Sequence, residues 1–223
     1  MRVLALTWEF PPVITGGLGM ACYGMVKALL KQGIEVDLIM PAKEAVYFQM
    51  RKVEDADDPP AVFTDPGKRT SQTFASAREF RRLVGSPVSV YYITGKRPGL
   101  KHKFVDIQQS SPFDCLFEVL SDQDYLFRQV RDYTETAVDI GSNLDFDVIH
   151  AHDWLTYPAG MVLKKLTGRP LVAHMHATEF DRAGGAGDGR IHNVEYIGME
   201  YADKVIAVSR YTANIITEKY CIG

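Results

Sequence analysis

Short apolar segments alternate with amphipathic segments along much of this chain, and that alternation restricts the fold more than any other feature. The apolar segments are rich in β-branched residues and nearly continuous, as in strands covered on both faces of a parallel sheet. Strands that alternate with helices predict an α/β fold with a mainly parallel sheet and right-handed crossovers. Five segments are expected to be strands: Arg2–Trp8, Ile34–Met40, Val148–His152, Pro170–His174 and Lys204–Ser209.

Segments beside these strands have the periodicity of amphipathic helices. A longer helix is predicted over 122–143, because Leu126, Val130, Tyr133 and Ala137 recur at spacings of three and four on one face. Four other helices are predicted: Leu18–Lys31, Thr156–Lys165, Val194–Ala202 and Tyr211–Tyr220.

The segment from about residue 43 to 122 is less regular and carries many prolines and glycines. Strands are expected at Val88–Ile93 and Leu116–Leu120, so we interpret this segment as an irregular insertion with extra strands. With 223 residues and about 150 residues per typical domain, we expect residues 1–223 to form a single domain that includes this insertion.

Composition excludes several classes of protein. A net charge of −3 with 46% hydrophobic residues is typical of a globular chain and offers no basic surface for a nucleic-acid backbone. No apolar run approaches the roughly 20 residues that span a bilayer, and no secretory signal is evident. Three widely spaced cysteines suit a reducing compartment better than a disulfide framework. A cytoplasmic location is therefore expected.

A glycine-containing loop follows the first predicted strand. Gly16, Gly17 and Leu18 open the first helix, where backbone N–H groups at the positive end of the helix dipole favour a phosphate or carboxylate. The alternative is that the paired glycines only permit the turn into the helix. A dinucleotide fingerprint is disfavoured, because Cys22 stands where its third glycine or alanine would be.

Two pairs of histidines lie at the carboxyl ends of two predicted strands. His150 and His152 are two residues apart on one strand, and His174 and His176 repeat the spacing on the next. Ligands of open α/β sheets bind at the carboxyl ends of strands. The pairs could donate and accept hydrogen bonds with a sugar or phosphate, ligate a metal together with nearby aspartates, or pack as structural residues. The spacing of metallo-hydrolase motifs is not met, so no metal is expected.

A second glycine-rich segment, Ala183–Arg190, contains four glycines and follows a charged cluster. It is interpreted either as a mobile lid over the strand ends or as an ordinary surface connection.

Three motifs taken together point to a family. Glu9-Phe10-Pro11-Pro12 leading to Gly16-Gly17-Leu18-Gly19, then His150-Ala151-His152-Asp153-Trp154, then the segment 202–209 resemble the N-terminal half of glycogen/starch synthases and related group 1 glycosyltransferases. The resemblance implies a Rossmann-like three-layer sandwich, one half of a GT-B fold. It implies a retaining glycosyltransferase that moves a sugar, glucose above all, from ADP-glucose or UDP-glucose to a glucan or small-sugar acceptor.

The resemblance also assigns roles to residues. Backbone groups of Gly16, Gly17 and Leu18 would contact the donor phosphate and sugar, and His152 would be catalytic by stabilising positive charge as the glycosidic bond breaks. No cofactor and no metal is implied beyond the nucleotide-sugar substrate. Trp154 or Tyr157 is also expected to stack on a sugar ring if exposed. The expected substrate pocket consists of Glu9, Asp153, Trp154, His176, Thr178 and Glu179.

The family's C-terminal half, which holds the nucleotide-sugar pocket, is not recognisable in this sequence. We therefore expect the chain to need its own C-terminal domain as a partner and to be inactive alone. Two other functions remain open at the level of sequence. One is a metal-dependent hydrolase built on the histidine pairs, and the other is a non-catalytic carbohydrate- or nucleotide-binding module.

Overall fold

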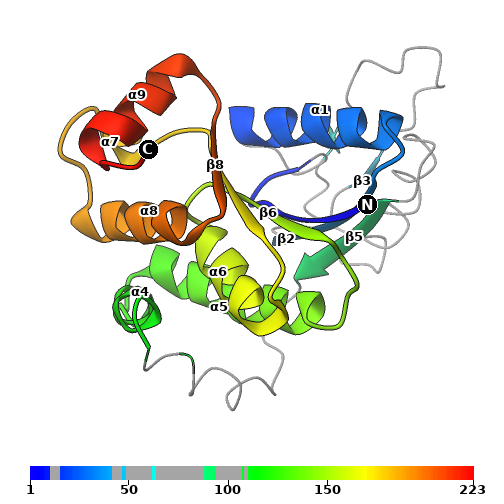
Figure 1. Ribbon diagram of the computed structural model, residues 1–223, viewed down its shortest axis with the longest axis horizontal. Helices are drawn as coiled ribbons and strands as arrows, with labels where there is room; N and C mark the ends of the chain where they lie inside the picture. Colours follow the sequence, from blue (N-terminus) through cyan, green and yellow to red (C-terminus); the bar gives the residue numbers. More distant parts are fainter. Residues whose placement is uncertain (11–15, 42–46, 49–61, 64–87, 94–106, 108–109) are drawn as a thin grey trace.

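A computed structural model describes residues 1–10, 16–41, 47–48, 62–63, 88–93, 107 and 110–223. Over these residues six strands form one parallel sheet, in the order β5-β2-β1-β6-β7-β8 (Figure 1). A separate antiparallel pair joins β3 (Tyr47–Phe48) to β4 (Val62–Phe63). The expected α/β fold with a mainly parallel sheet is confirmed. The strands of the large sheet are β1 (Arg2–Leu6), β2 (Glu35–Pro41), β5 (Val88–Ile93), β6 (Val148–His152), β7 (Leu171–Met175) and β8 (Lys204–Ala207).

Helices cover both faces of this sheet, which gives the three layers of a Rossmann-like sandwich. Helix α1 lies over one face, and α5 and α6 lie over the other (Figure 1). Within the described part of the chain no helix is long and apolar enough to cross a membrane. The helices are α1 (Gly17–Lys31), α4 (Phe113–Leu120), α5 (Tyr125–Gly141), α6 (Tyr157–Thr167), α7 (Glu179–Ala183), α8 (Gly189–Tyr201) and α9 (Arg210–Lys219).

Strand β1 contributes to two separate hydrophobic clusters. Val3 and Ala5 pack with Cys22 and Val26 of α1, whereas Leu4 and Leu6 pack with the helices of the opposite face. Successive side chains of a strand point to opposite faces, so a strand that is apolar throughout needs cover on both. That requirement explains why the nearly continuous apolar runs of the sequence form central strands.

One predicted strand is wrong. Leu116–Leu120 lies within helix α4, not in a strand. Phe113, Leu116 and Leu120 are all buried, at spacings of three and four residues, which is the periodicity of one helix face. The strands predicted at Val88–Ile93 and Val148–His152 are found with the predicted ends, and the other predicted strands and helices are found with shifted ends. The predicted helix 122–143 is α5.

Parts of the segment interpreted as an insertion belong to the main fold. Strand β5 pairs with β2 at the edge of the large sheet, with Val36 opposite Val88. Helix α4 contacts α5 and α8. Apart from β3, β4, β5 and residue 107, the range 43–109 lies outside the described residues.

Candidate active site

Four histidines meet at the carboxyl ends of β6 and β7. Ile149 and Ala151 point into the core beneath α5 and α6, so His150 and His152 point to the opposite face, where α1 lies. The register places His152 directly opposite His174, and His176 follows on the same side of the chain. The sequence predicts the two pairs separately, and the sheet brings them into one group, the four-histidine cluster.

The rings of the four-histidine cluster are paired across the two strands. His150 Nε2 lies 3.3 Å from His174 Nδ1, and His152 Nδ1 lies 2.9 Å from His176 Nε2. Histidines two residues apart in the chain are stacked, with ring centroids 4.4 Å apart for His150 and His152 and 4.2 Å apart for His174 and His176. Each cross-strand contact is a hydrogen bond between two imidazoles.

Burial keeps these imidazoles uncharged. Desolvation, followed by repulsion from neighbouring histidines, lowers the pKa of His150 to about 4 and that of His176 to about 3. The pKa of His152 lies well below its usual value for the same reasons, and burial also lowers the pKa of His174. At neutral pH each ring therefore has one N–H donor and one nitrogen acceptor.

One ring nitrogen of His152 takes no part in these hydrogen bonds. This nitrogen, Nε2, is buried and has no hydrogen-bond partner among the described residues. Buried polar atoms are nearly always paired. Among the described residues the hydroxyls of Ser142 and Tyr157 share this property with Nε2 of His152, but only His152 belongs to the four-histidine cluster.

Asp153 joins the two strand ends. Its φ of 59° is left-handed, a conformation that residues other than glycine adopt rarely and mostly at constrained or functional turns. Its carboxylate accepts hydrogen bonds from the backbone N–H groups of His176 at 2.7 Å and Ala177 at 3.4 Å. Its own N–H donates to the carbonyl of His174 at 2.9 Å. Burial raises the pKa of Asp153 to about 6.

An acidic side chain of the protein itself binds at the glycines that open α1. The N–H of Gly16, just before α1, donates to Oε2 of Glu9 at 3.0 Å. Gly17 begins the helix, and Leu18 is half-buried against both hydrophobic clusters. The anion at this helix N-terminus is therefore a side chain of the protein itself.

Two aromatic residues are not where sugar stacking requires them. Trp154 is 3% exposed and packs against Phe127, with centroids 5.8 Å apart. Tyr157 is fully buried, and an added Cβ at Gly198 of α8 would lie 2.4 Å from its ring. The expectation of sugar stacking depends on exposure, and neither residue is exposed in this structure.

Thr178 and Glu179 are engaged within the protein. Thr178 forms a capping box with Asp181 at the start of α7. Glu179 accepts hydrogen bonds from Arg182 Nε and from the N–H of Asp188, both at 3.1 Å. These contacts fix the turn after β7 in the orientation that carries His176.

A buried ionic network beneath this turn is not predicted from the sequence. Glu195 of α8 has no exposed surface and binds the guanidinium of Arg182, the hydroxyl of Tyr220 and the N–H of Glu179. The sequence does contain one sign of this network. Glu195 stands among positions of α8 that are otherwise apolar and buried, such as Ile191 and Met199. Such a residue requires a buried cation or hydrogen-bond donors.

The glycine-rich segment 183–190 is tied to this network. His192 Nε2 lies 2.6 Å from the carbonyl of Ala186, and the N–H of Asp188 reaches Glu179. Gly187 has a left-handed φ of 66°, and an added Cβ there would lie 2.6 Å from Cγ of Glu179. The segment is an anchored connection in this structure.

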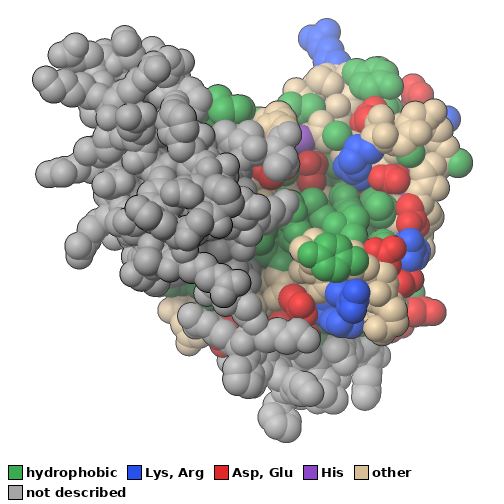
Figure 2. All heavy atoms as spheres, turned by 180° about the vertical axis from the view of Figure 1, so that it is seen from behind, with side chains coloured by type: hydrophobic (Ala, Val, Ile, Leu, Met, Phe, Trp, Pro, Cys, Tyr) green, Lys and Arg blue, Asp and Glu red, His purple; other side chains and the backbone are tan. Residues whose placement is uncertain are grey.

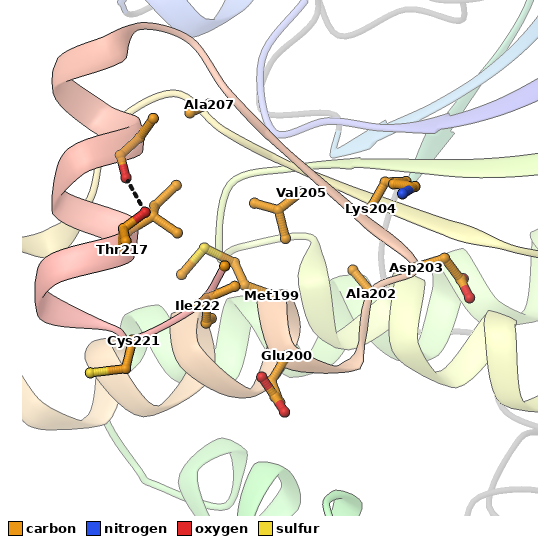
Figure 3. Close-up of a pocket in the computed structure, with 13 residues that line it drawn as sticks. Met199, Glu200, Ala202, Asp203, Lys204, Val205, Ala207, Thr217, Cys221 and Ile222 are labelled. Carbon is orange, nitrogen blue, oxygen red and sulfur yellow. Dashed lines mark hydrogen bonds between the residues drawn. The ribbon is translucent and has the colours of Figure 1, made fainter.

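A cavity of about 420 Å³ lies between α8, β8 and α9, and none of the four histidines lines it (Figure 3). Met199, Val205 and Ile222 give it an apolar side, and Asp203 and Lys204 lie at one end. Seen from behind, hydrophobic side chains gather in the middle of the described surface with acidic and basic side chains beside them (Figure 2).

The ring geometry bears on metal binding. Cys22, His152 and His176 bring possible ligand atoms within 4.8 Å of one another, as do His150, His152 and His174. A tetrahedral zinc with Zn–N distances of about 2.0–2.1 Å holds its ligand nitrogens about 3.3–3.4 Å apart. The 2.9 Å between His152 Nδ1 and His176 Nε2 is shorter than this and fits a hydrogen bond, whereas the 3.3 Å between His150 Nε2 and His174 Nδ1 fits either arrangement.

Two solved structures share the fold of this chain. The sucrose-phosphate synthase of Thermosynechococcus elongatus superposes with a TM-score of 0.58 at 14% identity over 97% of this chain and 44% of that one. The catalytic domain of starch synthase IV from Arabidopsis thaliana, solved with ADP and acarbose, gives 0.51 at 16% identity over 99% of this chain and 50% of that one. The fold is that of a Rossmann-like domain of the GT-B glycosyltransferases.

Sequence comparison identifies the family. The family model described as the starch synthase catalytic domain matches residues 2–223, and the chain belongs to this family. An uncharacterized glycosyltransferase of Methanocaldococcus jannaschii is 27% identical over 94% of this chain and 40% of its own length. A glycogen synthase of Mycobacterium tuberculosis is 25% identical over 100% of this chain and 46% of its own. The chain thus spans less than half the length of these two relatives.

Proposed function

We propose that this chain is the acceptor-side half of a retaining glycosyltransferase that transfers glucose from a nucleotide-sugar, ADP-glucose or UDP-glucose, to a glucan or small-sugar acceptor. One observation carries the proposal: Nε2 of His152 is buried and has no hydrogen-bond partner among the described residues. The chain that contains it belongs to the starch synthase family. A neutral imidazole with a vacant nitrogen suits a sugar hydroxyl and a developing positive charge.

The role of His152 in this proposal is electrostatic. Its lowered pKa makes it a poor proton donor at neutral pH and leaves it uncharged beside an oxocarbenium-like centre. An interaction that strengthens as charge develops lowers the barrier without tightening ground-state binding. The carbonyl of His152 already accepts a hydrogen bond from Thr156 Oγ1 at 2.9 Å, which fixes the backbone at this point.

Donor phosphate would bind at the N-terminus of α1. For that to happen, the N–H of Gly16 exchanges its bond to Glu9 for a bond to phosphate. Glu9 therefore serves as the stand-in anion until the donor arrives.

The remaining donor contacts would come from a second domain of the same polypeptide. The Mycobacterium and Methanocaldococcus relatives are more than twice as long as the part of them that this chain matches. We expect no sugar transfer from the 223 residues alone and transfer once they are joined to that second half.

The test is steady-state kinetics of the full-length polypeptide with ADP-glucose and UDP-glucose. His152→Ala is expected to lower kcat by about 100-fold or more while the donor KM changes little, as for an interaction made in the transition state. Exposed Asp145→Ala is the control. Turnover by the 223-residue chain alone, or an unchanged kcat for His152→Ala, would count against the proposal.

The hydrolase alternative has less support, because the chain belongs to the starch synthase family and His152 and His176 lie at the 2.9 Å of a hydrogen bond. Metal analysis of the purified full-length polypeptide tests it. Stoichiometric zinc or manganese that is lost in a His150→Ala/His174→Ala variant would favour the hydrolase.

A further inference from the structure

We infer that His176 is the positioning residue of His152: its Nε2 accepts the Nδ1–H of His152 and so leaves the Nε2 lone pair of His152 directed at the substrate. The consequence for catalysis rests on the proposed function, whereas the position of the proton is a property of this chain. The sequence alone places His176 only in the substrate pocket.

The direction of the hydrogen bond follows from the second ring nitrogen of His152. Its Nδ1 lies 2.9 Å from His176 Nε2, and its Nε2 is buried without a partner in the described part of the chain. If Nδ1 were the acceptor, Nε2 would carry an orphaned buried N–H, which is rarer in proteins than an under-used acceptor. The less costly arrangement protonates Nδ1 and leaves a lone pair on Nε2.

Both rings are neutral, so each carries a single N–H whose position can be assigned. Burial lowers the pKa of each, so the pair shares a single N–H···N bond at neutral pH and not a charged one. Which nitrogen of a neutral histidine carries the proton is set by the partner of the other nitrogen.

His176 is itself held in place on two sides. Its backbone N–H donates to the carboxylate of Asp153 at 2.7 Å, and its ring stacks on His174 with centroids 4.2 Å apart. Asp153 follows His152 directly in the chain and takes a left-handed conformation to reach His176. The Asp153 carboxylate thus fixes the backbone of His176 relative to the residue that follows His152, in addition to the contact between the two rings.

The assigned tautomer matters for the chemistry. With the proton on Nδ1, the negative end of the imidazole dipole lies at Nε2 and faces the developing positive charge of the sugar. The opposite tautomer would present an N–H to the same charge and would raise the barrier. His176 therefore acts through His152 and need not touch the substrate.

The tautomer can be measured directly in the isotope-labelled chain by NMR correlations between ring protons and ring nitrogens. We expect His152 to carry its proton on Nδ1 in the wild type and in His176→Gln, whose side-chain carbonyl can accept the same bond. His176→Ala is expected to give a mixture of tautomers or the reverse one. His150→Gln, which alters the other imidazole pair, is the matched control and is expected to leave the assignment unchanged.

Kinetics of the full-length enzyme supply a second measurement. His176→Ala is expected to lower kcat by about 10- to 100-fold, the range for outer partners that orient functional histidines, with little change in donor KM. His176→Gln should recover most of this loss, which a merely structural role would not predict.

The outcomes separate the inference from the proposed function. A proton on Nε2 of His152 in the wild type, or an unaltered tautomer in His176→Ala, overturns the inference whatever the activity. The expected tautomers in a full-length polypeptide that transfers no sugar support the inference and contradict the proposed function.

Discussion

The carboxylate of Glu9 accepts a hydrogen bond from the backbone N–H of Gly16 at 3.0 Å, at the end of α1 where a donor phosphate would bind. Glu9 is 9% exposed, and the first turn of α1 contains no acidic residue. One carboxylate thus supplies the negative charge that the helix dipole favours at this position.

Replacing Glu9 by Gln should strengthen the binding of ADP to the full-length polypeptide. The amide oxygen still accepts from Gly16, but the charge that competes with phosphate is gone. An interaction of about 0.3–1 kcal/mol at a helix terminus corresponds to a decrease in Kd of about 2- to 5-fold. Calorimetric titration measures it, with exposed Glu35→Gln as control, and equal or weaker binding by Glu9→Gln would contradict the prediction.

The stability of the chain should fall on acidification from about pH 6.5 to pH 4. The histidines of the cluster have lowered pKa values in the folded state, so the unfolded chain binds more protons in this range. Asp153, whose pKa burial raises to about 6, and Glu195, whose pKa burial also raises, act in the opposite direction, because their protonated forms favour the folded state. The four histidines outweigh these two carboxyls.

Urea unfolding at a series of pH values measures this effect. His150→Gln should reduce the slope of unfolding free energy against pH by up to about 1.4 kcal/mol per pH unit between about pH 4 and pH 6.5. A slope identical to that of the wild type would mean that His150 is not desolvated in the folded protein.

Gly198→Ala should destabilise the fold. A Cβ at this position would lie 2.4 Å from Cδ2 of Tyr157, and both the ring and helix α8 are held by core packing. Overpacking of this kind costs about 1–3 kcal/mol. Gly189→Ala, at the start of the same helix with nothing within 4 Å, is the control and should be neutral or stabilising. Thermal and urea unfolding compare the two variants, and equal stabilities would refute the packing argument.

Arg182→Ala should cost about 3–5 kcal/mol of unfolding free energy, because it leaves Glu195 buried without its cation. The comparison is Arg169→Ala, which removes a pair to Asp145 at 3.6 Å between exposed side chains and should cost less than about 1 kcal/mol. Denaturant unfolding of both variants provides the two values. If Arg182→Ala costs as little as Arg169→Ala, the Tyr220 hydroxyl and the Glu179 N–H are sufficient partners for Glu195, and the prediction is wrong.

Particular residues explain how far the sequence can predict this structure. The strands can be found because stretches such as Val3 to Leu6 are apolar on both faces, and only a central strand needs that pattern. The histidine pairs can be placed at strand ends for the same reason. The strand predicted at Leu116 rests on its apolar neighbours, although Phe113 and Leu120 lie at helical spacing from it.

Other contacts depend on three-dimensional details that no local pattern contains. The bond between His152 and His176 requires the register of β6 against β7 and the left-handed turn at Asp153. The burial of Tyr157 depends on Gly198, which is far away in sequence and lets α8 approach the ring. The contact between Glu9 and Gly16 depends on how close the end of β1 lies to the start of α1.

The central position of β1 has a consequence for synthesis on the ribosome. One of its neighbours, β2, begins at Glu35, but the other, β6, begins only at Val148. At about 5–20 residues per second, β1 waits for about 5 to 20 s after β2 emerges before its second edge can be paired. A nascent chain therefore exposes an apolar strand edge for that interval, and chaperones that bind such edges have their longest access to this protein before Val148 has left the exit tunnel.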